Sequence, residues 1–170
     1  MEGRYLYNSG DLTEEEVNKL YADKSSYRIL SLSETCNNML MWSHCAESHS
    51  GIAIGISVIE TGPKVKKISY VDDLDISSIR GGSIGKSDVA EKLLLRKYKL
   101  WEYEREQRVL IKNKSFVRIE IHEIVFGIKI SSENKENVNN LVQKHCPNIN
   151  IVEMTGTQLD KGQKTMGAPW

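Results

Sequence analysis

The sequence predicts an α+β fold, with a mixed, mainly antiparallel sheet of about six strands and about three helices. Apolar and small residues alternate strictly from Gly51 to Val58, which is the period of a strand. Helix-start patterns occur at Thr13 and at Asp88. Near the C-terminal end a helical pattern stands between two strand patterns. Strands are therefore expected both next to one another and separated by helices.

The N-terminal part contains one helix, one short apolar segment and two strands. Thr13 and Glu16 form a capping-box pattern that starts the helix. The apolar run Met39–Trp42 indicates a turn or short helix that fills a core. In the strand from Gly51 to Val58, one face carries only small residues, so a helix or a flat ligand can approach the backbone closely. A second strand is expected at Val65–Val71.

The next helix starts at Asp88 and extends to Trp101, because apolar residues recur at helical spacing over this stretch. After Trp101 the period changes to two, so Glu104, Glu106 and Arg108 project from one face of a strand. The remaining expected elements are strands at Val117–Ile121 and Ile124–Ile130, a helix from Glu133 to His145 capped by Ser131 or Ser132, and a strand at Ile149–Met154.

Length and composition limit the class of protein. The chain has 170 residues, which we interpret as a single α+β domain over residues 1–155 and a C-terminal tail at 156–170. Its 23 basic and 23 acidic residues cancel, so there is no strong nucleic-acid signal. The apolar stretch Ile52–Ile59 is far shorter than the roughly 20 residues that cross a membrane. Three cysteines fit a reducing compartment, and we expect a cytoplasmic protein without membrane partners.

A glycine-rich segment, Arg80-Gly-Gly-Ser-Ile-Gly-Lys-Ser87, is close to a phosphate-binding loop. Arginine replaces the first glycine of that motif, and the preceding residues form only a weak strand pattern. The segment is therefore interpreted as a surface loop. Its two basic side chains and its helix entry would be able to contact phosphate without hydrolysing it.

Soft metal ligands gather in one region of the chain. Cys36, His44, Cys45 and His49 lie within fourteen positions, but they lack a repeated Cys-x-x-Cys pair and a His-x-x-x-His pair. We therefore expect no metal. Cys45 is a poor candidate nucleophile, because its nearest base is the adjacent His44.

Charged and aromatic residues around position 100 are the strongest chemical signal. Glu106 and Arg108 on one strand face, with Glu104 close by, can orient a polar ligand or activate a hydroxyl. The alternative is a solvated strand face whose charges pair across the sheet. Lys99 and Trp101 are equally open to two interpretations, as site residues or as a helix end that packs on the core.

Several spaced blocks resemble domain-of-unknown-function family 2971, a prokaryotic and phage family. The blocks are Ile29–Glu34, Asn38–His44 followed by Ala46 and His49–Gly51, Lys99-x-Trp-Glu-Tyr-Glu-x-Glu-x-Arg108, and Ile121-x-Glu-Ile-Val-Phe-Gly127. The resemblance runs from Ile29 to about Ile151. Cys45 replaces the family's usual tyrosine, and the leading strand pair is missing, so the chain resembles an N-terminally shortened member. The missing strands would leave a sheet edge uncovered, which favours a homo-oligomer.

The resemblance implies a shared pocket but no reaction. The matching polar and aromatic residues expected to converge as a ligand-binding site are Ser33, Glu34, Trp42, His44, His49, Lys99, Trp101, Tyr103, Glu106 and Arg108. We expect a nucleotide-like small molecule there, with aromatic rings on the base and Lys99 and Arg108 on phosphate. One form of this function is sequestration of a signalling nucleotide in phage defence or anti-defence.

Two other functions stay open. In the first, the chain is similar to ADP-ribosyltransferases and uses NAD, with Glu106 holding the ribose and His44 positioning the dinucleotide. Under the binding hypothesis no cofactor is expected, and no residue is catalytic. In the second, the polar cluster is a satisfied buried network inside a protein-interaction module.

Overall fold

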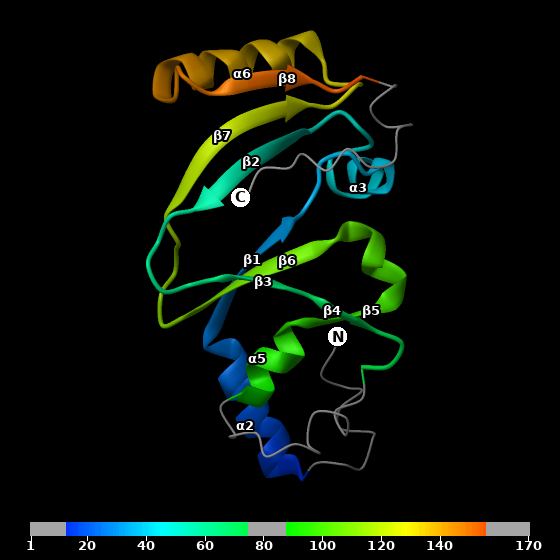
Figure 1. Cartoon of the computed structure of the whole chain (residues 1–170), viewed down its shortest axis with the longest axis vertical. Coiled ribbons are helices and arrows are strands. Elements are labelled where there is room, and N and C mark those ends of the chain that lie inside the picture. The colour runs from blue at the N-terminus through cyan, green and yellow to red at the C-terminus, as the bar shows by residue number, and fades with distance from the viewer. Residues whose placement is uncertain (1–12, 75–87, 156–170) are drawn as a thin grey trace. The chain divides into compact units, whose positions relative to one another are not determined.

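The computed structural model describes residues 13–74 and 88–155, and it confirms the α+β class with mainly antiparallel sheets (Figure 1). The strands are divided among three small sheets, with the orders β1-β6-β3, β2-β7-β8 and β4-β5. The elements are α2 (Glu14–Ser25), β1 (Tyr27–Ser33), α3 (Met39–Cys45), β2 (Ile52–Val58), β3 (Val65–Lys67), β4 (Ser69–Val71), α5 (Asp88–Leu94), β5 (Arg96–Tyr98), the 3-10 helix η1 (Lys99–Glu104), β6 (Glu106–Lys112), β7 (Ile119–Phe126), α6 (Ser132–His145) and β8 (Asn150–Glu153).

The residues expected to form one domain, 1–155, group into two compact units. Unit 1 is drawn from Met1–Leu32 and Gly62–Val117, and unit 2 from Ser33–Thr61 and Arg118–Trp170. The expected tail at 156–170 and the glycine-rich segment at 80–87 lie outside the described residues. Within the ranges that the structure does describe, no helix is long and apolar enough to cross a membrane.

Unit 1 is built around β6, which lies between β1 and β3. Val109 and Ile111 of β6 are buried, as their alternation predicts, and Val65 of β3 pairs with Val109 in antiparallel register. Helices α2 and α5 lie side by side (Figure 1). Thr13 caps α2 through the full capping box with Glu16, so this helix start is confirmed.

The helix expected to reach Trp101 ends at Leu94 instead. After it the chain forms β5, which pairs in parallel with β4, and then η1. The Leu95 carbonyl accepts the Ser69 N–H at 2.8 Å, and the Leu94 carbonyl accepts from the Arg108 guanidinium. These carbonyls are satisfied by tertiary partners, so the apolar periodicity beyond Leu94 reflects packing of other elements and not a continued helix.

Unit 2 contains the sheet β2-β7-β8, in which β2 is antiparallel and β8 parallel to β7. Of the two predicted caps of α6, Ser131 and Ser132, the structure shows Ser131. Val142 of this helix packs with Ile124 and Phe126 of β7. Trp42 of α3 forms a second cluster with Val125 and Met154. The two strands expected between residues 117 and 130 form one strand, β7. The helix between parallel β7 and β8 confirms the β-α-β ending.

Candidate functional site

The ten predicted site residues divide evenly between the two units. Lys99, Trp101, Tyr103, Glu106 and Arg108 belong to unit 1, and Ser33, Glu34, Trp42, His44 and His49 belong to unit 2. The structure describes each unit by itself, so the convergence of the two groups stays a prediction.

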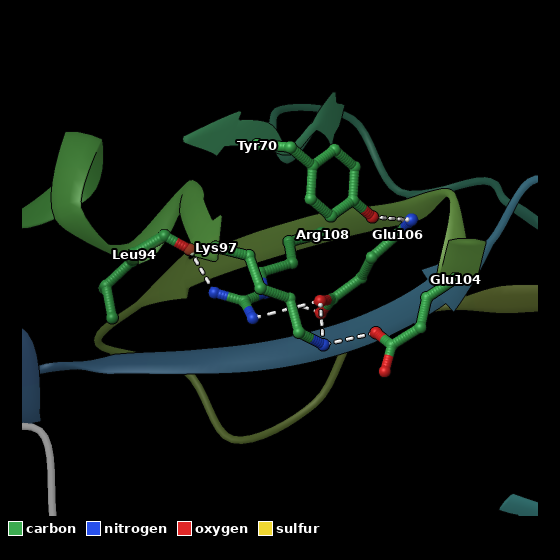
Figure 2. A network of polar contacts seen from close by, with 6 residues as sticks. All are labelled: Tyr70, Leu94, Lys97, Glu104, Glu106 and Arg108. Carbon is green, nitrogen blue, oxygen red and sulfur yellow. Dashed lines mark hydrogen bonds and ion pairs between the residues drawn. The ribbon is translucent and has the colours of Figure 1, made fainter. Parts of the chain in front are cut away.

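In unit 1, Glu106 is the centre of a set of polar contacts that we call the Glu106 network: Tyr70, Lys97, Glu104, Glu106 and Arg108 (Figure 2). Arg108 Nε donates to Glu106 Oε1 at 2.6 Å, and Arg108 Nη2 donates to Oε2 at 3.1 Å. Lys97 Nζ lies 3.0 Å from Glu106 Oε2 and also forms an ion pair with Glu104. Two cations therefore meet two carboxylates, and the network has no net charge.

The network draws its residues from several elements. The Tyr70 hydroxyl of β4 accepts the Glu106 backbone N–H at 2.6 Å, and Arg108 Nη1 donates to the Leu94 carbonyl at the end of α5. Arg105 lies between the two acidic residues with φ +45°, in the left-handed region. This turn ends η1 and brings Glu104 and Glu106 to the same ammonium group.

Burial and ion pairing shift the pKa values of Glu106 and Lys97 in opposite directions. Glu106 is 7 % exposed, and burial by itself raises the pKa of its carboxyl. Hydrogen bonds from Arg108, Lys97 and Ser31, with the charge of Arg108, outweigh burial and hold that pKa below its usual value. Burial lowers the pKa of Lys97, but its bonds to the two carboxylates outweigh this and raise it. The pair is ionised at neutral pH.

The aromatic residues of η1 lie against this network. Lys97 Nζ is 5.2 Å from the centre of the Trp101 ring, and the Trp101 and Tyr103 ring centres are 5.9 Å apart. The Trp101 side chain remains 43 % exposed. Lys99 is well exposed, and its Nζ lies 3.8 Å from Oδ2 of the still more exposed Asp72. Unit 1 therefore combines an open indole with a loosely held cation.

In unit 2, Trp42 is part of the core. Its side chain is 3 % exposed, and its Nε1 donates to the Cys36 carbonyl at 2.5 Å. This position explains the apolar Met-Leu-Met-Trp segment, but it does not offer a free ring face for a nucleobase. Ser33 Oγ makes local bonds with the Thr35 backbone, and Glu34 is exposed.

His49 and Ser43 form a direct contact in the same unit. Ser43 Oγ lies 2.9 Å from His49 Nε2, whereas His49 Nδ1 is buried without a hydrogen-bond partner among the described residues. His44, at the end of α3, is exposed. The contact with Ser43 thus places His49, of the two predicted histidines, beside a nucleophilic side chain.

Two further features of the described residues bear on ligand binding. Among residues 13–74 and 88–155, no group of three or more histidine, cysteine, aspartate or glutamate side chains is arranged to hold a metal ion. A hollow of about 580 Å³ lies in unit 2, between residues 119–122 of β7 and residues 145–149, which begin at the last residue of α6. None of the ten predicted site residues lines it.

Sequence reasoning found the centre of the Glu106 network but missed part of it. Neither Lys97 nor Tyr70 is among the ten predicted site residues. The signal for Lys97 in the sequence is its position at the start of a twelve-residue stretch, 97–108, that contains three glutamates of opposite charge. Tyr70 left no such signal, because its contact with Glu106 depends on the parallel pairing of β4 with β5.

Comparison of the chain with models of protein families, with curated proteins and with solved structures gave no match. The resemblance to family 2971 therefore stays a prediction.

Proposed function

We propose that the chain binds a nucleotide-like small ligand on unit 1, with the base stacked on Trp101 and phosphate held by Lys99. The observation that carries the proposal is the half-exposed indole of Trp101, supported on the Glu106 network with Lys97 5.2 Å from its ring centre. A flat, supported aromatic surface is well suited to stacking on a base, because little side-chain freedom is lost on binding.

In this proposal Lys99, and not Arg108, meets the phosphate. Three nitrogens of Arg108 already donate to Glu106 and to the Leu94 carbonyl. Lys99 is 58 % exposed, and its Nζ lies 3.8 Å from Oδ2 of the solvated Asp72 carboxylate. A surface pair of this kind contributes little free energy, so exchange of the carboxylate for a phosphate costs little. Glu106 and Arg108 then act as positioning residues beneath Trp101.

The proposal is tested with a panel of adenine and guanine mono- and dinucleotides. Binding raises the melting temperature and quenches Trp101 fluorescence, and mass spectrometry recovers the nucleotide intact if the function is sequestration. Trp101→Leu should abolish the thermal shift, and Lys99→Gln should weaken it. The matched controls are Phe116→Leu, which removes another exposed aromatic ring of unit 1, and Lys64→Gln, which removes another exposed lysine charge. Equal shifts in Trp101→Leu and the parent chain contradict the proposal.

An NAD-dependent ADP-ribosyltransferase is a less favoured alternative. A carboxylate has about four acceptor positions. Arg108 contributes two donors to Glu106, and Lys97 and Ser31 contribute one each. A ribose hydroxyl must therefore displace one of these donors. Release of nicotinamide from NAD, lost in Glu106→Gln, would support this alternative over simple binding.

A protein-interaction module is the second alternative, and one observation favours it. Leu100 on η1 is 75 % exposed next to the half-exposed Trp101, so the same surface presents apolar area to a partner. The partner that the sequence suggests is a second copy of this chain. Sedimentation velocity of the parent chain and of Leu100→Ser tests this, because a dimer through η1 dissociates in the variant while a nucleotide response does not require Leu100.

A further inference from the structure

Ser43 and His49 form a side-chain pair with the geometry of a nucleophile and its base. Ser43 Oγ is 2.9 Å from His49 Nε2, within the range over which a histidine can take a hydroxyl proton. Both residues are partly buried, so their side chains are partly protected from water but are not enclosed in the core. This pair lies in unit 2 and belongs to neither the Glu106 network nor the surface of η1.

The backbone that presents His49 is strained. Glu47, Ser48 and His49 have φ angles of +49°, +53° and +75°, so three successive residues that are not glycine occupy the left-handed region. This conformation is unfavourable for such residues, and it persists only where the surroundings hold it. Strain of this kind is concentrated at functional sites, where it fixes a side chain in a required direction.

Hydrogen bonds on both sides of His49 supply that support. Its N–H donates to the Trp42 carbonyl, and its carbonyl accepts the Lys129 N–H, both at 3.0 Å. The end of β7 also lies close, since a Cβ on Gly127 would be only 2.2 Å from the His49 carbonyl oxygen. Trp42, adjacent to Ser43 in the chain, is buried in the core. Both members of the pair are therefore held on rigid backbone.

The two imidazole nitrogens of His49 have different surroundings. Nε2 faces Ser43, whereas Nδ1 is buried and has no partner within the described part of the chain. Satisfying Nδ1 would be the simpler arrangement for a purely structural histidine, because an unpaired buried polar atom costs free energy. A neutral ring with its proton on Nδ1 leaves Nε2 free to accept the hydroxyl proton.

We propose that Ser43 and His49 are a catalytic dyad that cleaves small carboxylic esters with good leaving groups. Ser43 Oγ attacks the ester carbonyl carbon while its proton passes to His49 Nε2. The bond from that carbon to the leaving oxygen breaks, and the departing alcohol takes the proton from Nε2. Water then attacks the acyl-Ser43 carbonyl with the same proton relay, which releases the carboxylic acid and restores the Ser43 hydroxyl.

A neutral ester fits the surroundings better than a phosphate. Within the described residues, the two side chains are in hydrogen-bond contact with each other, and the His49 backbone is in contact with the Trp42 carbonyl and the Lys129 amide. None of these contacts comes from a charged side chain. A carbonyl substrate needs no cation to approach, whereas transfer of a phosphoryl group relies on cations around its oxygens.

The test uses the full chain with a fluorophosphonate probe, which reacts with activated serines, and with p-nitrophenyl acetate as substrate. The expected result is one covalent adduct, mapped by peptide mass spectrometry to Ser43, together with release of p-nitrophenol. Ser43→Ala should abolish both. His49→Asn, whose side chain tolerates left-handed backbone, should slow labelling about 100-fold or more.

The matched control is Ser50→Ala, in the same loop, where Ser50 Oγ donates to the Glu47 carbonyl and not to a base. This variant should label at the parent rate. Circular dichroism of each variant establishes that it is folded. Labelling of Ser43 no faster than that of Ser50, or parent-rate labelling in a folded His49→Asn chain, overturns the proposal.

Discussion

Glu106 and Arg108, two residues apart on β6, meet through two parallel hydrogen bonds of 2.6 and 3.1 Å. Residues at this spacing project from the same face of a strand, so the bidentate pair forms within one strand. Lys97 adds a second cation to the same carboxylate, and the Leu94 carbonyl engages the guanidinium from the opposite side. The pair thereby connects β6 with β5 and with the end of α5.

Glu106→Gln is expected to destabilise the chain by about 3 kcal/mol, because two partly buried cations lose their shared carboxylate. Chemical denaturation followed by circular dichroism measures the loss. Glu102→Gln is the matched control, since Glu102 is an exposed carboxylate of η1, and it should change stability by less than about 0.5 kcal/mol. Equal effects of the two substitutions would show that the network contributes nothing specific.

The pH dependence of stability follows from the shifted groups. The folded-state pKa of Glu106 lies below its ordinary value of 4.5, so its stabilisation is complete above about pH 4.5 and is lost as pH falls through the lowered pKa. The pKa of Lys97 lies above 10.5, so its contribution is complete below that pH and is lost as pH rises through the raised value. Denaturation at a series of pH values should show a flatter acid limb in Glu106→Gln than in the parent chain.

Tyr70→Phe removes the acceptor of the Glu106 backbone N–H and is expected to cost about 1–3 kcal/mol. Burial raises the pKa of the Tyr70 hydroxyl, and the charges of Glu106 and Glu104 raise it further, against the bond from the Glu106 N–H and the charge of Lys97. In a spectrophotometric titration, the tyrosine that ionises above the ordinary value of 10.0 should be missing from the variant. An unchanged titration curve would contradict the assigned environment.

Gly127→Ala should destabilise the chain by about 3 kcal/mol or more, because the added methyl group meets the His49 carbonyl at 2.2 Å and backbone cannot move aside cheaply. Gly62→Ala is the informative comparison. Gly62 has φ +115° and open space around it, so the stability lost in Gly62→Ala comes from the backbone conformation and not from a steric clash. Thermal unfolding of both variants separates the two causes, and a Gly127→Ala chain as stable as the parent would show that the contact is relieved easily.

Local sequence signals predicted the elements that depend on local chemistry. The capping box at Thr13, the cap at Ser131 and the alternation of Val109 and Ile111 are all confirmed, because each depends on residues close in the chain. The prediction that the second helix continues beyond Leu94 was wrong, and strand β1 was not predicted. In both cases the backbone partners come from distant segments, as in the bond from Ser69 to Leu95.

The candidate sites show the same division. Pairing of Glu106 with Arg108 was among the possibilities that strand periodicity allowed, since both side chains share one face. The contact of Ser43 with His49 was not foreseen, although both residues lie in the Asn38–Gly51 motif region. Residues six apart do not share a face of a helix, so helical periodicity does not predict this contact. The contact depends on the left-handed turn at Glu47–His49, and this turn is hard to predict from the sequence because none of its three residues is glycine.

The chain passes between its two units three times, after Leu32, Thr61 and Val117. During synthesis, β6 emerges only with the second segment of unit 1, and β7 only with the second segment of unit 2. The partners of α2 and β1 in unit 1 are α5 and β6, which lie about 75 residues later in the chain. The apolar faces of α2 and β1 therefore stay uncovered until those partners are synthesised, which favours slow, concerted folding. A contiguous fragment ending near residue 61 holds the first segment of each unit and completes neither. Dissection of this protein therefore requires the two segments of one unit to be joined by a linker, because truncation alone separates neither unit.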